Sequence, residues 1–201
     1  MATAQLYLAS RSPRRAELLA QIGITADFSL LSGAARETDE TPRPREDPQE
    51  YVKRLARTKA ALAWHRLTKS GAPLLPVLAA DTAVALTQEI FGKPRDVPEA
   101  RRMLAQLSGR QHEVFTAVAL RLTHDMEVAC SRSVVRFRVL TPEEIDRYIA
   151  SGEPFDKAGA YGIQGRAAAF VSHLEGSYSG VMGLPLFETS ALLARAGIFV
   201  I

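Results

Sequence analysis

The segments with the clearest chemical content carry charged side chains where the surrounding pattern predicts carbon. Residues 10–15 (SRSPRR) follow an apolar run and open an expected helix. Unpaired N–H groups at a helix start attract anions, whereas arginines there oppose the helix dipole. A bound phosphate would resolve this conflict. The alternative is that Arg14 and Arg15 are solvated or paired with acids such as Glu17.

Lys59 and Asp81 interrupt two apolar patterns. Lys59 lies four residues after Leu55, on the apolar stripe of an expected helix, so it either snorkels to solvent or binds phosphate in an interior cleft. Asp81 stands within the apolar run VLAADTAVAL, and a buried carboxylate is costly unless it is paired, protonated or bound to metal. We interpret Asp81 as a general base or metal ligand, the alternative being a structural residue that caps a loop.

Two glycine-containing segments complete the set. In residues 91–96 (FGKPRD), Gly92 permits close approach to a ligand and Pro94 stiffens the chain that carries Lys93. An ordinary turn lysine is the alternative. Residues 152–165 (GEPFDKAGAYGIQG) place Asp, Lys, Tyr and Gln close together, which suits recognition of a polar small molecule. A tolerant surface loop would look similar.

The elements that must position these residues alternate irregularly along the chain. We expect a long polar loop at residues 32–46, which at this length favours a functional role as much as a linker. A hairpin among the strands favours a mixed α/β sheet with flanking helices over a doubly wound parallel sheet. The expected strands are residues 5–10, 26–31, 77–86, 112–122, 127–139 and 170–174, and the expected helices are residues 13–23, 48–67, 97–106, 142–150 and 185–196.

Composition limits the class of protein. A chain of 201 residues predicts one domain, residues 1–201, with a core large enough to need no disulfides. The single cysteine, Cys130, excludes an internal disulfide framework and a Cys-based zinc site. The net charge of +3 comes from scattered basic residues with only 7% aromatics, which predicts no nucleic-acid partner. No apolar run suits a membrane span and no secretory signal is apparent, so we expect a soluble cytoplasmic protein.

Taken together, the motifs resemble the Maf family over almost the whole chain. They occur in the family's order: LYLASRSPRRAELL, ETDE, RLARTKA, AADTAV, FGKPRD, LSGRQHEVFTAVAL, GEPFDKAGAYGIQG and GLPLFET. The resemblance implies a nucleoside triphosphate pyrophosphatase with a Maf/inosine triphosphatase-like fold, in which two lobes surround a cleft. It implies a small-molecule nucleotide as the partner. A homodimer is expected only because members of the family commonly form one.

The resemblance also assigns residues. Asp81 matches the family's proton acceptor, and Glu40, in ETDE, matches an acidic loop residue that helps with metal or water. The polar residues around the triphosphate match Ser10, Arg15, Lys59 and Lys93. A divalent cation, Mg²⁺ or Mn²⁺, suits the hard oxygens of Asp81 and Glu40. Which of the two carboxylates acts as base and which as metal ligand stays open.

Three further positions separate the family by base preference, and here they are Arg14, Thr82 and Gln164. The motifs SPRR, ADT and YGIQG resemble the branch that hydrolyses dTTP and UTP, whereas the 7-methyl-GTP branch resembles SPWRR. Gly180 departs from the family, because many members carry asparagine there. The alternatives are a 7-methyl-GTP or purine pyrophosphatase, and a nucleotide-binding regulator of cell division without turnover.

Overall fold

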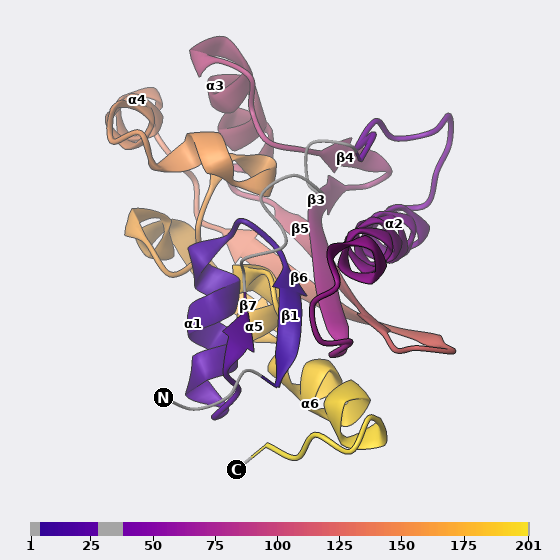
Figure 1. The fold of residues 1–201 in the computed structure, drawn as a ribbon. Helices are drawn as coiled ribbons and strands as arrows, with labels where there is room; N and C mark the ends of the chain where they lie inside the picture. The colour runs from indigo at the N-terminus through magenta and orange to yellow at the C-terminus, as the bar shows by residue number, and fades with distance from the viewer. Residues whose placement is uncertain (1–4, 28–37, 201) are drawn as a thin grey trace.

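The computed structural model describes residues 5–27 and 38–200, and a mixed sheet of seven strands forms its centre (Figure 1). Along the sheet the order is β2-β1-β3-β5-β6-β7, and β4 pairs with β3 off this path. β1 is parallel to β2 and β3, while the other pairs are antiparallel. The strands are β1 (Leu6–Ala9), β2 (Ala26–Asp27), β3 (Val77–Leu86), β4 (Glu89–Phe91), β5 (Gln111–Arg121), β6 (Met126–Phe137) and β7 (Val171–Glu175). The predicted mixed α/β class is confirmed.

Three helices, at residues 48–70, 97–107 and 142–150, begin where the sequence predicts, because a capping side chain and a proline mark each start. Asp47, Asp96 and Thr141 each accept backbone N–H groups from the first turn of the helix that follows. Only Thr141 forms a reciprocal capping box, with Glu144. The helices are α1 (Pro13–Gln21), α2 (Pro48–Ser70), α3 (Val97–Leu107), α4 (Pro142–Ala150), α5 (Tyr178–Met182) and α6 (Leu186–Arg195).

Several short elements were not predicted. α5 is one, and its N-terminus is capped by Ser177, whose hydroxyl accepts from the Gly180 N–H. The others are the strand β4 and three 3₁₀ turns, at η2 (Glu153–Asp156), η3 (Ala158–Ala160) and η4 (Arg166–Phe170). Turns this short lack the apolar periodicity on which sequence prediction depends. The expected strand at 26–31 is present as β2, and its residues 28–31 lie outside the described part of the chain.

The core divides into three apolar clusters around the sheet. α2 packs on one face of β3 and β5, and α1 and α6 pack on the opposite face. The third cluster joins α3, α4 and the 3₁₀ turns to the far ends of β3, β5 and β6. In Figure 1, α3 and α4 accordingly form one end of the molecule and α6 the other. We call these two ends the two lobes. The long strands β3, β5 and β6 pass through both lobes and connect them.

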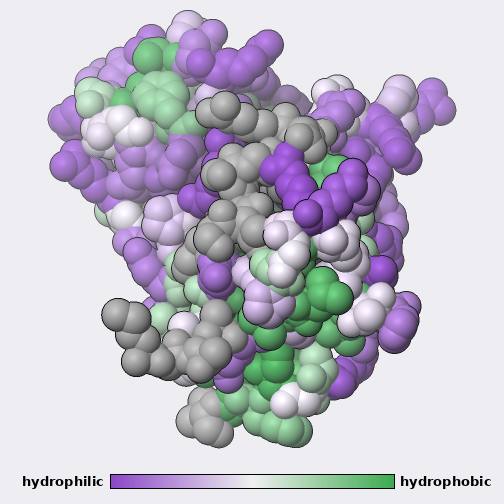
Figure 2. Space-filling model, viewed as in Figure 1, coloured by the Kyte–Doolittle hydropathy of each residue, from purple (hydrophilic) through white to green (hydrophobic). Residues whose placement is uncertain are grey.

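The surface differs between the lobes. In Figure 2, hydrophilic side chains cover most of the α3 and α4 end, whereas hydrophobic surface gathers at the α6 end. Phe187, in α6, and Phe199, beyond it, are exposed there. In the described residues, no helix is long and apolar enough to cross a membrane.

Candidate active site

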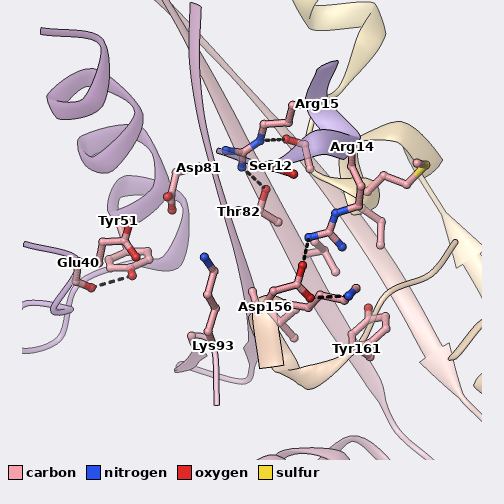
Figure 3. Close-up of a pocket in the computed structure, with 18 of the residues that line it drawn as sticks. Ser12, Arg14, Arg15, Glu40, Tyr51, Asp81, Thr82, Lys93, Asp156 and Tyr161 are labelled. Atoms are coloured by element: carbon pink, nitrogen blue, oxygen red, sulfur yellow. Dashed lines mark hydrogen bonds and ion pairs between the residues drawn. The ribbon is translucent and has the colours of Figure 1, made fainter. Parts of the chain in front are cut away.

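Two adjoining cavities lie between the lobes and collect nearly all the predicted site residues (Figure 3). We call them the main cavity and the phosphate-side cavity. The main cavity is lined by Arg14, Arg15, Glu40, Lys59, Asp81, Thr82 and Lys93, together with residues of α5 and the 3₁₀ turns. Ser10 lines the phosphate-side cavity, next to the start of α1. Gln164 is exposed and lines neither cavity, so its role in base preference stays a prediction.

Lys59 and Asp81 form a buried ion pair where α2 crosses β3. The Lys59 Nζ lies 2.5 Å from Asp81 Oδ1 and 2.6 Å from Glu40 Oε1. Lys59 is only 9% exposed and Asp81 7% exposed. The lysine therefore faces an interior cleft, and its ammonium bridges two carboxylates. Asp81 sits inside the sheet opposite Ala117 of β5, so its position is fixed by strand register.

The two carboxylates of this cluster differ in their affinity for protons. Burial raises the pKa of Asp81 above its ordinary value, and the attraction of Lys59 and Arg15 offsets only part of that effect. Burial also acts on Glu40, but Lys59, Lys93 and Arg15 together bring the pKa of its carboxyl below the usual value. Asp81 is thus the better proton acceptor, and Glu40 the more persistent anion.

Three hydrogen bonds fix the guanidinium of Arg15. Its Nε donates to the Gly183 carbonyl at 2.7 Å, and its other nitrogens donate to Ser10 Oγ at 3.1 Å and Thr82 Oγ1 at 3.3 Å. Gly183 ends α5 with φ 117°, a left-handed conformation that favours glycine and turns its carbonyl toward Arg15. The arginine is preorganised to face the cavity before any ligand binds.

Thr116 is a buried hydroxyl that sequence analysis missed. Its Oγ1 lies 2.7 Å from the Gly180 carbonyl oxygen and 3.0 Å from Thr82 Oγ1. The Thr116 hydroxyl is the donor toward both oxygens. Thr82 Oγ1 also accepts from Arg15, so it links the arginine to this buried hydroxyl. A hydroxyl within the apolar pattern of β5 was the available signal, of the kind that singled out Asp81 in β3.

Tyr51 holds the loop that carries Glu40. Its hydroxyl donates to the Glu40 carbonyl oxygen at 2.8 Å, and Figure 3 shows the two side by side at the cavity edge. Arg54, one turn further along α2, binds the same loop through Glu46 and the Thr41 carbonyl. Sequence analysis did not identify these contacts, because a tyrosine on an apolar helix face resembles ordinary core.

Lys93 lies in the connection between β4 and α3. The Gly159 N–H donates to the Gly92 carbonyl at 3.0 Å, which fastens this connection to the 3₁₀ turns. Lys93 is exposed, and Figure 3 shows its side chain extending into the cavity from the side opposite Arg15. A Cβ at Gly92 would meet nothing within 4 Å, so close approach to a ligand there stays a prediction.

The far wall of the main cavity comes from η2, η3 and the chain that follows. Asp156 Oδ2 lies 3.6 Å from Arg14 Nη2, and its Oδ1 accepts from Lys157 Nζ at 2.5 Å. Tyr161 is buried with its hydroxyl 2.8 Å from His112 Nε2. The expectation that residues 152–165 face a ligand-sized space is supported for Asp156, Lys157 and Tyr161.

The described residues contain no group of three or more His, Cys, Asp and Glu side chains arranged to hold a metal ion. Glu40 and Asp81 nonetheless converge on one point, which the Lys59 ammonium occupies. Mg²⁺ is commonly held by one or two carboxylates plus substrate phosphates. Two converging carboxylates beside a cationic cavity fit that donor set.

The cavity combines a buried carboxylate with several cationic side chains, an arrangement typical of the class of protein that holds a small polyanion beside an activated water. Comparison with known proteins agrees with this class. Residues 5–196 match the model of the family described as Maf-like protein, and the chain belongs to the Maf family.

Curated relatives resemble it over nearly their full length. It is 54% identical over 198 residues to a dTTP/UTP pyrophosphatase of Nitrosomonas europaea, and the aligned region covers 97% of this chain and 96% of the relative. It is 55% identical over 195 residues to one of Ralstonia nicotianae, covering 96% and 94%. It is 53% identical over 193 residues to one of Chromobacterium violaceum, covering 96% and 95%.

Proposed function

We propose that the chain is a nucleoside triphosphate pyrophosphatase that hydrolyses dTTP and UTP to the monophosphate and pyrophosphate. The observation that carries this is the buried ion pair of Lys59 and Asp81, which the half-exposed Glu40 joins, with Arg15 and Lys93 lining the same cavity. The cluster supplies a base and cations at one place, as cleavage of a phosphoanhydride requires. The names of the relatives support the choice of dTTP and UTP.

The reaction follows from the placement of these groups. Asp81 takes a proton from a water molecule as the water oxygen forms a bond to the α-phosphorus. The bond from that phosphorus to the bridging oxygen breaks, and pyrophosphate leaves. Because burial raises the pKa of Asp81, its carboxylate is a stronger base than an exposed one. Arg15, Lys59 and Lys93 stabilise the charge that develops on the leaving group, and three hydrogen bonds set the position of Arg15 before binding.

We also propose a divalent cation, Mg²⁺ or Mn²⁺, as cofactor. Glu40 and Asp81 are the residues that would hold it, with Lys59 shifting toward the phosphates. When bound, the ion would neutralise charge on the triphosphate. Either carboxylate serves as ligand in this proposal, while Asp81 alone lies deep enough to act as base.

The proposed setting is the cytoplasm, with free nucleoside triphosphates as partners rather than nucleic acid or a membrane. This rests on the scattered basic residues and the single cysteine of the chain. Assembly as a homodimer rests on the family resemblance alone.

The experiment is pyrophosphate release from dTTP, UTP, CTP, GTP and 7-methyl-GTP, with Mg²⁺ or Mn²⁺, by the wild-type chain and Asp81→Ala. We expect a preference for dTTP and UTP that the variant loses. A preference for 7-methyl-GTP would keep the chemistry and overturn the base preference. No turnover by folded protein, with nucleotide still bound, would replace the enzyme with a nucleotide-binding regulator.

A further inference from the structure

The two cavities differ in what surrounds them, and this difference orients a nucleotide. Among the described residues, the phosphate-side cavity is lined by the start of α1 and by five basic side chains against two acidic ones, Glu40 and Asp156; the basic ones are Arg11, Arg14, Arg15, Lys59 and Lys93. Its apolar lining is Ala9 and Pro13, whereas the main cavity has larger apolar side chains, from Val84, Val114, Tyr161, Val181 and Met182. Polyphosphate suits the first and a nucleobase the second, with Asp81 at the main-cavity side of the junction.

On the far wall of the main cavity, the charged side chains of the described lining are Asp156 and Lys157, and Arg14 reaches them from α1. Arg14 and Asp156 also line the phosphate-side cavity, so they lie where the two cavities adjoin. Asp156 lies 3.6 Å from Arg14 Nη2 and 2.5 Å from Lys157 Nζ, and Figure 3 shows its carboxylate facing the Arg14 guanidinium. Along the cavity wall, the side chains therefore present a hydrogen-bond donor (Arg14), an acceptor (Asp156) and a second donor (Lys157). The Asp156 side chain is 66% exposed, so its carboxylate oxygens keep lone pairs beyond those that Arg14 and Lys157 engage.

Lys157 is held in place rather than loosely solvated. Its Nζ donates to the Glu153 carbonyl at 2.7 Å and to Asp156, which leaves the third of its three N–H bonds for a ligand. Its stem fills the space beside Gly162, where a Cβ would lie 2.6 Å from Lys157 Cε. The glycine is what allows the ammonium to reach this position.

Asp156 stays ionised in this setting. Partial burial raises the pKa of its carboxyl, but the hydrogen bond from Lys157 and the charge of Arg14 lower it further, below the ordinary value. At neutral pH the group is an acceptor only.

We propose that Arg14, Asp156 and Lys157 read the pairing edge of the pyrimidine, with the Asp156 carboxylate accepting the N3–H of uracil or thymine. Uracil and thymine present acceptor, donor and acceptor at O2, N3–H and O4, which complements donor, acceptor and donor. Cytosine presents an acceptor at N3 and a donor at N4. Its N3 lone pair would meet the Asp156 carboxylate and its N4 amino group would meet a cation, so neither pair could form a hydrogen bond. The inference deepens the proposed function and rests on it, because it assumes that a pyrimidine triphosphate is the substrate.

The experiment measures kcat/KM for pyrophosphate release from UTP, CTP and N3-methyl-UTP. The proteins are the wild-type chain, Asp156→Asn, Asp156→Ala and a control, Asp146→Asn. Asp146 is a comparable partner of an arginine, Arg101, but lies on α4 and lines neither cavity. Thermal unfolding of each variant establishes that it is folded.

We expect Asp156→Asn to lower the ratio of UTP to CTP turnover at least about tenfold, since the new amide can donate to cytosine N3. In Asp156→Ala the advantage of UTP over N3-methyl-UTP shrinks by a similar factor. The control keeps both ratios. A merely structural aspartate would lower turnover of all three nucleotides equally, and unchanged ratios would overturn the inference.

Failure of the proposed function gives a different result. If the wild-type chain hydrolyses no pyrimidine triphosphate, the proposed function and this inference fall together. If it hydrolyses UTP and N3-methyl-UTP equally well, only the reading of N3–H by Asp156 fails. That second comparison needs no variant, so it decides the matter even if the Asp156 variants do not fold.

Discussion

The two walls of the main cavity are built in opposite ways. In the catalytic wall, Lys59 and Asp81 stand on a helix of 23 residues packed against a strand of 10 residues, and the half-exposed Glu40 joins them from the loop before the helix. The recognition wall, formed by Asp156, Lys157 and Tyr161, begins with a 3₁₀ turn of four residues. Lys59 and Asp81 are almost fully buried, whereas the side chain of Asp156 is mostly exposed.

This contrast matches what each wall must do. Charges act most strongly where water is excluded, so a group that changes the energy of the transition state gains from burial in regular structure. A group that compares two bases needs only the correct donor or acceptor at a cavity surface. Changes in the catalytic wall should therefore remove turnover, and changes in the recognition wall should alter selectivity while the fold is kept.

The largest effect expected is that of Asp81→Asn. The amide has almost the same size but cannot accept a proton, so turnover of UTP should fall by about 10²–10⁴-fold. Steady-state pyrophosphate release measures this, and thermal unfolding controls for the fold. Full turnover by a folded Asp81→Asn protein would mean that the catalytic wall has no base.

The next effect concerns the support of the recognition wall. His112, bonded to Tyr161, is buried, which lowers its pKa from 6.5 to about 4. Because the unfolded chain takes up this proton at higher pH than the folded one, the contribution to stability is complete above about pH 6.5 and is lost as the pH falls toward 4. The free energy of unfolding should decrease by about 3 kcal/mol over that interval.

Chemical denaturation at a series of pH values measures this dependence. Carboxylates also titrate there, so the comparison is with His112→Gln, which should show a distinctly shallower decrease than wild type. Parallel curves for the two proteins would mean that the recognition wall does not rest on a neutral, buried histidine.

A smaller effect is expected at Tyr51. Tyr51→Phe removes the hydroxyl that holds the Glu40 carbonyl, a loss of about 1 kcal/mol, or roughly fivefold in kcat/KM. The double variant with Glu40→Gln should lose less than the two single losses combined, because both act through Glu40. Additive losses in this double-mutant cycle would show that Tyr51 acts independently of the loop.

The smallest effect expected is on the stability of Asp156→Asn. An exposed aspartate contributes little through its ion pairs, so the free energy of unfolding should change by no more than about 0.5 kcal/mol. Denaturant unfolding of this variant beside wild type measures it. A loss above 2 kcal/mol would place Asp156 among structural residues and remove the contrast between the walls.

Much of the architecture was predictable because it depends on local information. Caps and apolar periodicity located α2, α3 and α4 within a few residues of their bounds, and the hairpin of β5 and β6 marked a mixed sheet. The 3₁₀ turns and α5 were missed, since they are too short for a repeating pattern. Lys59 and Asp81 stood out because a charge in an apolar run is costly wherever the fold places it.

The sequence by itself determined that Lys59 and Asp81 stand within the apolar patterns of α2 and β3, because periodicity assigns a residue to a face of its own element. Only the tertiary structure decided which charges meet. Lys59 bridges Asp81 and Glu40 because α2 packs across β3, and Arg14 reaches Asp156 because the sheet brings both lobes to one cleft. Such contacts depend on strand register and helix packing, which couple residues far apart in the chain and leave no local signal.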